Sequence, residues 1–200
     1  MARRNQHSKE ELQQLAVAAV RELVTEQGVD KLSARKLAER IGYTPGMLYH
    51  VFANQDEMIL HANAVTLDTL LAAMAAHQSL PAAQALRAMA AEYMQLAMAE
   101  TALWQLVVSH RMGDQQAVPR WYQRRTDALF ALVEQQVARL AQGHSAGQIQ
   151  LAAQTLWSAV HGITVLSVDN KLDVAGQADA NEMLDSLLRH YLGSWQREAP

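Results

Sequence analysis

The residues from 45 to 50 combine side chains that can contact a nucleic acid through both polar and apolar groups. Tyr49 and His50 can donate hydrogen bonds to a phosphate or a base edge, whereas Pro45 and Met47 offer apolar surface of the kind that a thymine methyl group accepts. Gly46 lies between them and allows a partner to come close to the backbone. Together these residues predict a small, partly polar recognition surface.

Two short helices joined by a tight turn are expected to position this surface. Ser33 is a good N-cap residue for a helix over 33–41, and Gly42 predicts the end of that helix because glycine tolerates a positive φ. Thr44 can cap a second helix over 44–51, in which Pro45 occupies the first turn.

The second helix also has a face that should be buried. Leu48 and Phe52 lie four residues apart, so they can pack on the same side. The pattern is typical of a helix-turn-helix. The hydroxyls of Ser33 and Thr44, with the helix N-termini behind them, suit phosphate oxygens.

This segment resembles the N-terminal domain of the TetR family of bacterial transcriptional regulators. The family string Gly-x-Thr/Ser-x-Gly-x-Leu-Tyr-x-x-Phe is matched at Gly42, Thr44, Gly46, Leu48, Tyr49 and Phe52. The preceding Leu-Ser-Ala-Arg-Lys-Leu-Ala stretch and the helix that ends at Gly28 are also similar to the family. The resemblance covers about residues 8–61. It implies an all-helical homodimer that binds a palindromic double-stranded DNA operator and is released by a small-molecule effector.

The resemblance implies two further DNA contacts. Arg35 matches an arginine that reaches a base in close relatives, so we expect it to contact a guanine. Gln55 stands where the family commonly has a lysine that grips a phosphate; a glutamine releases no counterion, so we expect weaker DNA binding with a shallower salt dependence. The predicted DNA-binding residues are Ser33, Arg35, Thr44, Pro45, Gly46, Met47, Tyr49, His50 and Gln55.

The composition favours a helical protein of the cytoplasm. Half of the 200 residues are hydrophobic, proline is scarce, and the absence of cysteine excludes disulfides and thiolate metal sites. The net charge is −3, but residues 1–52 carry +2 and the remainder −5, which is weak support for a DNA-binding N-terminus. We see no signal peptide and no apolar run long enough to cross a membrane.

Helical periodicity continues to the C-terminus, so we expect an all-α fold of about nine helices. Pairs typical of a capping box occur at Ser8 with Glu11 and at Ser145 with Gln148. We predict a helix-turn-helix domain over residues 1–53, followed by an effector-binding and dimerisation domain over residues 54–200.

The C-terminal part contains apolar and aromatic residues that suit a flat or lipophilic effector. The predicted contacts are Tyr93, Met94, Met98, Trp104, His110, Trp121, Tyr122, Trp157 and His161. Core packing is the alternative for each of them. The run from Trp157 to Gly162 also resembles the Trp-x-x-x-His-Gly signature of one C-terminal subgroup. The alternative is that Trp157 and His161 are packed neighbours on one helix face.

The last two long helices have broad apolar faces, which two copies of the chain could pair into a four-helix bundle. The family resemblance points to the same interface. The predicted dimerisation residues are Leu156, Val160, Ile163, Leu184, Leu187, Leu188 and Tyr191.

Two other classes of function fit parts of the sequence. Ser33 and Lys36 match the Ser-x-x-Lys pattern of penicillin-binding hydrolases, but the companion Lys-Thr-Gly string is missing. No nucleotide-binding, cofactor-binding or zinc-protease motif occurs, so we expect no enzyme activity, no cofactor and no metal. A helical dimeric interaction protein that has lost specific DNA binding remains the alternative.

Overall fold

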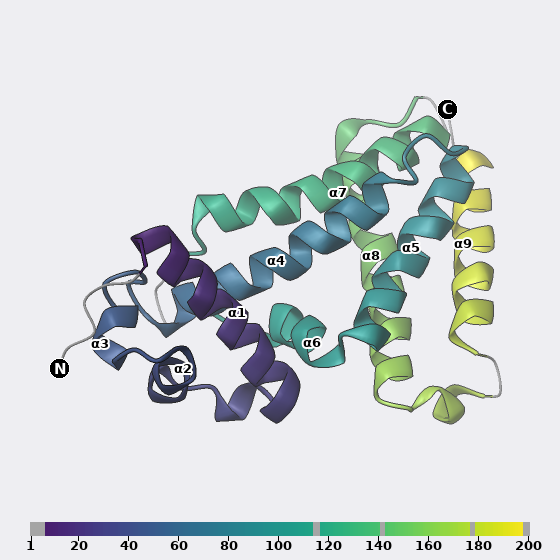
Figure 1. Ribbon diagram of the computed structural model, residues 1–200. Helices are drawn as coiled ribbons and strands as arrows, with labels where there is room; N and C mark the ends of the chain where they lie inside the picture. The colour runs from purple at the N-terminus through teal and green to yellow at the C-terminus, as the bar shows by residue number, and fades with distance from the viewer. Residues whose placement is uncertain (1–6, 114–116, 141–142, 177–178, 198–200) are drawn as a thin grey trace. The chain divides into compact units, whose positions relative to one another are not determined.

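A computed structural model describes residues 7–113, 117–140, 143–176 and 179–197 (Figure 1). Within these ranges all regular structure is helical, which confirms the predicted all-α class of about nine helices. Two short 3₁₀ helices, η1 (Val29–Lys31) and η2 (Leu172–Ala175), accompany the α-helices. The α-helices are α1 (Lys9–Gln27), α2 (Ala34–Ile41), α3 (Pro45–Leu48), α4 (Gln55–Ala75), α5 (Ala82–Ala99), α6 (Thr101–Ser109), α7 (Arg120–Leu140), α8 (Ala146–Val168) and α9 (Ala180–Arg197).

The chain folds into two compact units, which we call the head unit and the body unit. The head unit consists of residues 1–66 and 102–122, and the body unit of residues 67–101 and 123–200. The head unit therefore contains α6 as well as the helix-turn-helix. The division predicted after residue 53 separates the chain by function, into a DNA-binding part and an effector-binding part. It stays a prediction.

The head unit has its own apolar core. Leu37, Leu48 and Phe52 are almost completely buried in it, as the four-residue spacing of the last two predicted. Val20 and Leu23 contribute from α1, because residues three or four apart lie on one helix face. This core holds α2 and α3 against α1. It thereby fixes the orientation of the exposed side chains on α2, α3 and the turn that joins them.

Local sequence signals set several helix ends. The capping boxes at Ser8 with Glu11 and at Ser145 with Gln148 are both present, so both of these predictions are confirmed. At the start of α4, the Asn54 side chain accepts a 2.8 Å hydrogen bond from the backbone N–H of Glu57. Each of these side chains satisfies an N–H group that the helix itself cannot pair.

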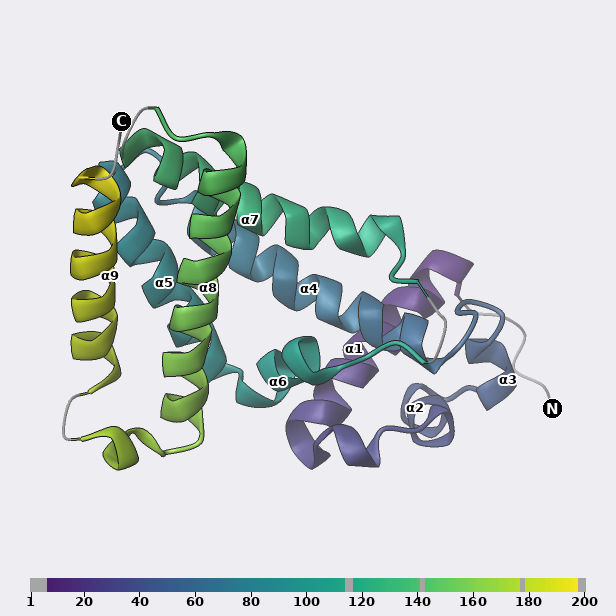
Figure 2. The ribbon, with the colours of Figure 1, turned by 180° about the vertical axis from the view of Figure 1, so that it is seen from behind.

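In the body unit, α5, α8 and α9 lie side by side, as both views show (Figures 1 and 2). On α9 the buried positions recur every three or four residues and end at Trp195, whose indole N–H donates to the backbone carbonyl of Val137 on α7 at 3.3 Å. The C-terminal half of α7 is thereby joined to the end of α9.

Two helices, α4 and α8, are long and apolar enough to cross a membrane by length and composition, so the expectation that no segment reaches this limit was wrong. Core helices of water-soluble proteins can have the same length and hydropathy. More than half (56%) of the most apolar stretch of α4 is buried inside the protein, which is typical of a core helix, whereas only 28% of the corresponding stretch of α8 is buried. Two large apolar side chains of α8, Leu151 and Trp157, are exposed in a single chain.

Candidate nucleic-acid interface

The turn between α2 and α3 has the geometry that the sequence predicted. Gly42 adopts a left-handed conformation with φ 75° and ψ 29°, and the N–H of Tyr43 donates to the carbonyl of Ala38 at 2.8 Å. This is the Schellman arrangement, which satisfies carbonyls at the end of a helix. The Tyr43 hydroxyl is also hydrogen-bonded to His7 Nδ1 at 2.6 Å, so the turn is joined to the residues before α1.

The second helix is shorter than predicted. α3 ends at Leu48, and the chain continues to Phe52 through turns such as the 3.0 Å bond from the Val51 N–H to the Leu48 carbonyl. Thr44 stands at the N-cap, but its side chain makes no capping hydrogen bond. Two parts of the prediction were therefore wrong. The helix ends at Leu48 and not at residue 51, and the Thr44 hydroxyl does not cap it.

Most of the predicted DNA-binding side chains are open to solvent. The exposed residues are Arg35, Thr44, Pro45, Gly46, Tyr49 and His50, and the partly buried ones are Ser33, Met47 and Gln55. Tyr49 is 49% exposed although it is large and aromatic, so the core does not account for it. The hydroxyl of Ser33 caps α2, since it accepts a 3.3 Å hydrogen bond from the N–H of Lys36.

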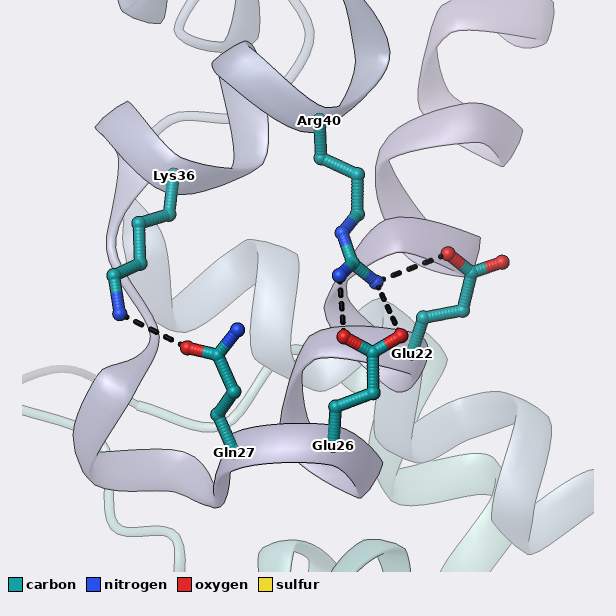
Figure 3. A network of polar contacts seen from close by, with 5 residues as sticks. All are labelled: Glu22, Glu26, Gln27, Lys36 and Arg40. Atoms are coloured by element: carbon teal, nitrogen blue, oxygen red, sulfur yellow. Dashed lines mark hydrogen bonds and ion pairs between the residues drawn. The ribbon is translucent and has the colours of Figure 1, made fainter.

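Two of the three cationic side chains on α2 are held by α1 (Figure 3). The Arg40 guanidinium forms hydrogen bonds and ion pairs with Glu26, and one of its nitrogens lies 3.3 Å from a carboxylate oxygen of Glu22. The Lys36 ammonium donates to the Gln27 side-chain oxygen at 3.0 Å. The hydrogen bond from Arg40 lowers the pKa of Glu26, and the same bond raises the pKa of Arg40.

The third cation on α2 has a different partner. Arg35 Nε lies 3.0 Å from an oxygen of Glu39, one turn further along the same helix. Arg35 is thus the α2 cation that is not tied to α1, and its side chain is 84% exposed.

At the start of α4, the two acidic residues that follow Gln55, Asp56 and Glu57, both contact other groups of the head unit. Asp56 accepts a 3.3 Å hydrogen bond from the N–H of Gly113 and lies 3.4 Å from His110 Nε2, while Glu57 accepts one from the N–H of Ala53. No local sequence pattern indicates the partners of Asp56, which lie more than 50 residues away from it. Burial lowers the pKa of His110, and the charge of Asp56 opposes this shift.

The head unit also contains four of the predicted effector contacts. Trp121 stacks on His61 with 4.4 Å between ring centroids, and its ring meets that of Tyr122 edge to face at 5.8 Å. His61 in turn packs against Phe52 and receives a hydrogen bond from the Gln13 amide. Sequence reasoning missed His61 and Gln13 because their partners are distant along the chain. The other two predicted contacts, both largely covered, are Trp104 and His110.

The body unit brings three other predicted effector contacts together. The Tyr93 hydroxyl and His161 Nδ1 are joined by a 2.7 Å hydrogen bond, and Trp157 stacks on His161 at 5.2 Å. Phe130, which was not predicted, meets Trp157 edge to face at 5.8 Å. Burial lowers the pKa of His161. The two remaining predicted contacts differ in exposure: Met94 is buried and Met98 is 58% exposed.

The predicted dimerisation residues divide into two groups. The fully covered ones are Leu156, Val160, Leu184 and Leu188, and the partly covered ones are Ile163, Leu187 and Tyr191. The first group already packs within one chain, so it has little surface left for a second copy. Leu151 and Trp157 on α8 are 63% and 41% exposed, and they offer more apolar surface than any residue of the first group.

The alternative hydrolase pair is not arranged for catalysis. The Ser33 hydroxyl accepts from the backbone N–H of Lys36, while the Lys36 ammonium is bonded to Gln27. A nucleophile and its base would need a direct contact between the hydroxyl and the amine. Across the described ranges, no group of three or more His, Cys, Asp or Glu side chains is placed to hold a metal ion.

Comparison with known proteins matches two family descriptions to this chain. "Tetracyclin repressor-like, C-terminal domain" matches residues 86–191, and "Bacterial regulatory proteins, tetR family" matches residues 16–62. No curated protein sequence matches at a significant level.

Solved structures share the fold at low sequence identity. A protein of unknown function from Rhodococcus sp. RHA1 is 20% identical, with 98% of this chain and 100% of that chain covered and a TM-score of 0.77. BioQ in complex with its double-stranded DNA operator is 18% identical, with 96% and 100% covered and a TM-score of 0.66. RolR in complex with resorcinol is 12% identical, with 96% of each chain covered and a TM-score of 0.62.

The C-terminal family description alone covers more than half of the chain, and the N-terminal one covers the helix-turn-helix built from α2 and α3. The chain therefore belongs to the TetR family of bacterial transcriptional regulators.

Proposed function

We propose that this protein is a repressor that binds a palindromic operator as a homodimer and leaves it when a lipophilic or aromatic small molecule binds. The observation that carries the proposal is the exposed set Arg35, Thr44, Pro45, Gly46, Tyr49 and His50, which stands on a buried helix-turn-helix core. Exposed aromatic and cationic side chains on a rigid support are typical of a recognition surface.

Gly46 supports a role in close contact with DNA. A Cβ atom placed there would meet only the Thr44 hydroxyl oxygen, at 4.0 Å, and the backbone does not need a positive φ. The fold itself therefore gives no reason for a glycine. A DNA backbone or base edge that approaches α3 closely would give one.

Dimerisation supplies the second half of the operator site. Two copies of a helix-turn-helix read a palindrome when their recognition helices enter successive major grooves, about one helical turn apart. The exposed apolar side chains of Leu151 and Trp157 on α8 favour α8 and α9 as the interface. The partly covered Ile163, Leu187 and Tyr191 belong to the same proposal.

Release by an effector is the third part of the proposal. The cluster of Tyr93, Phe130, Trp157 and His161 combines aromatic rings with one hydrogen-bonded polar pair, which suits a flat ligand. Among the structural neighbours, RolR was crystallised with resorcinol. A ligand that binds better to a dimer whose two heads do not fit successive grooves would shift the population away from DNA.

Residues 1–53 would then be the DNA-binding domain and residues 54–200 the effector-binding and dimerisation domain, working in the cytoplasm where the operator is. The alternative is a helical dimeric interaction protein that has lost specific DNA binding. The overall net charge of −3 and the neutral Gln55 favour this alternative. The BioQ–operator complex of the same fold favours the regulator.

Selection of duplexes from a random DNA library by the purified protein tests the proposal. A regulator of the proposed kind enriches a palindrome whose half-sites are centred about one helical turn apart. A reporter gene placed behind that palindrome should be silenced by the protein. Recovery of unrelated sequences after several rounds would overturn the proposal in favour of the interaction protein.

A further inference from the structure

The ion pair between Arg35 and Glu39 does not fit a role in stability. Both side chains are open to solvent, with 84% and 63% of their surface exposed, and exposed pairs contribute little. The arginine precedes the glutamate by four residues, which is the less favourable order along a helix.

The place of Glu39 in α2 is also unfavourable for the helix. α2 runs only from Ala34 to Ile41, so Glu39 stands in its last turn. The helix dipole disfavours a carboxylate there. On a surface proposed to meet phosphates, the same charge lowers the general affinity for DNA. A residue that opposes both helix stability and general DNA affinity needs another reason.

The ion pair leaves a specific part of the arginine available. Glu39 binds Nε of Arg35, and across the described ranges the two terminal amino groups of that guanidinium form no hydrogen bond or ion pair with any residue. Lys36 and Arg40, by contrast, are held by α1 (Figure 3). Two terminal amino groups of an arginine form the fork that fits the O6 and N7 atoms of guanine.

We infer that Glu39 is a positioning residue for base reading, which holds Arg35 by Nε so that its terminal fork faces a guanine. The inference rests on the proposed operator binding and adds a second residue to it. A guanidinium without this carboxylate rotates freely and also reaches neighbouring phosphates, which carry no sequence information. Glu39 therefore lowers general affinity for DNA and raises discrimination at one base pair.

The test compares wild type, Arg35→Ala and Glu39→Ala on the selected operator, on single-base variants of it and on an unrelated duplex. Arg35→Ala identifies the guanine, since its loss should reduce discrimination at that base pair by about fivefold to 150-fold. Glu39→Ala should reduce discrimination at the same base pair by about twofold to tenfold. It should also bind the unrelated duplex at least as tightly as wild type does.

Glu10→Ala is the matched control, because it removes one exposed carboxylate from the same unit, on α1. Thermal unfolding should show that Glu39→Ala is no less stable than wild type. The double variant Arg35→Ala, Glu39→Ala should discriminate no worse than Arg35→Ala alone, because the carboxylate acts through the arginine.

The outcomes separate this inference from the proposed function. If wild type selects an operator but Glu39→Ala changes all duplexes equally, as Glu10→Ala does, Glu39 acts only by its charge and the inference is overturned. If Glu39→Ala loses discrimination at a different base pair, it contacts DNA independently and the inference is also overturned. If wild type selects no sequence, the proposed function fails and the inference fails with it.

Discussion

His161 stacks on Trp157 with 5.2 Å between ring centroids and an angle of 17° between the rings, while its Nδ1 is bonded to the Tyr93 hydroxyl. Burial lowers the pKa of this imidazole from its ordinary value of 6.5, so the folded protein favours the neutral ring.

This relationship predicts a pH dependence of stability. The unfolded chain binds more protons than the folded protein in the range just below pH 6.5, so the free energy of unfolding falls as pH drops through this range. The contribution is fully present above pH 6.5. His161→Gln should therefore show a smaller loss of melting temperature between pH 7.5 and pH 5.5 than wild type. His110, whose pKa burial also lowers, should account for part of the remainder.

His190→Gln is the matched control for this experiment, because His190 is exposed on α9. Equal pH dependence of wild type and His161→Gln would show that the folded protein accommodates the charged imidazole without cost. That result would contradict a preference of the aromatic cluster for the neutral ring.

Gly46→Ala should separate DNA binding from folding. Its Cβ would meet only the Thr44 hydroxyl oxygen, at an ordinary contact distance of 4.0 Å, and alanine favours a helix over glycine by about 1 kcal/mol, so stability should be unchanged or slightly raised. Operator affinity should fall by about tenfold or more, because the methyl group meets DNA that approaches α3 closely. Gly147→Ala, where a Cβ meets no atom within 4 Å at the start of α8, should leave operator affinity unchanged. Equal affinities of Gly46→Ala and wild type would remove α3 from the proposed interface.

Gln55→Lys should strengthen DNA binding and make it more sensitive to salt. A lysine at the first position of α4 can neutralise one phosphate in each half-site and release its counterion. The slope of log K against log salt should steepen by about 0.9 for each half-site. Gln196→Lys adds the same charge at the end of α9 and should leave the slope as it is in wild type. An unchanged slope in Gln55→Lys would show that position 55 does not contact phosphate.

Leu151→Glu should weaken the dimer. This leucine is 63% exposed on α8, where a second copy would bury it, and a buried unpaired carboxylate is costly. Sedimentation velocity should show dimers of wild type and a shift toward monomers in the variant. Gln150→Glu, the neighbouring exposed position, adds the same charge and tests whether charge alone matters. A variant that stays fully dimeric would place the interface elsewhere.

The features that sequence alone predicted correctly depend on neighbouring residues. The capping boxes at Ser8 and Ser145, the left-handed Gly42 and the buried pair Leu48 and Phe52 each need only a few adjacent positions. Helix periodicity and cap chemistry act over the same short range, so they can be recognised without the fold.

The features that sequence did not predict depend on residues far apart. Glu26 lies 14 residues from Arg40, and Asp56 lies 57 residues from Gly113, so nothing near either residue indicates the contact. The length of α3 was misjudged for a related reason. Leu48 and Phe52 are both buried in the apolar core of the head unit. The chain reaches Phe52 through turns after Leu48, where the local pattern predicted a further helical turn.

The measurement that tests the central claim most directly is fluorescence anisotropy of duplex DNA from upstream of the protein's own gene, at two salt concentrations. Wild type is compared with the double variant Arg35→Ala, Tyr49→Ala, whose side chains are both exposed. The proposed function predicts specific, salt-sensitive binding by wild type and its loss in the variant. Equal binding by both proteins, to this duplex and to an unrelated one, would contradict recognition through these residues.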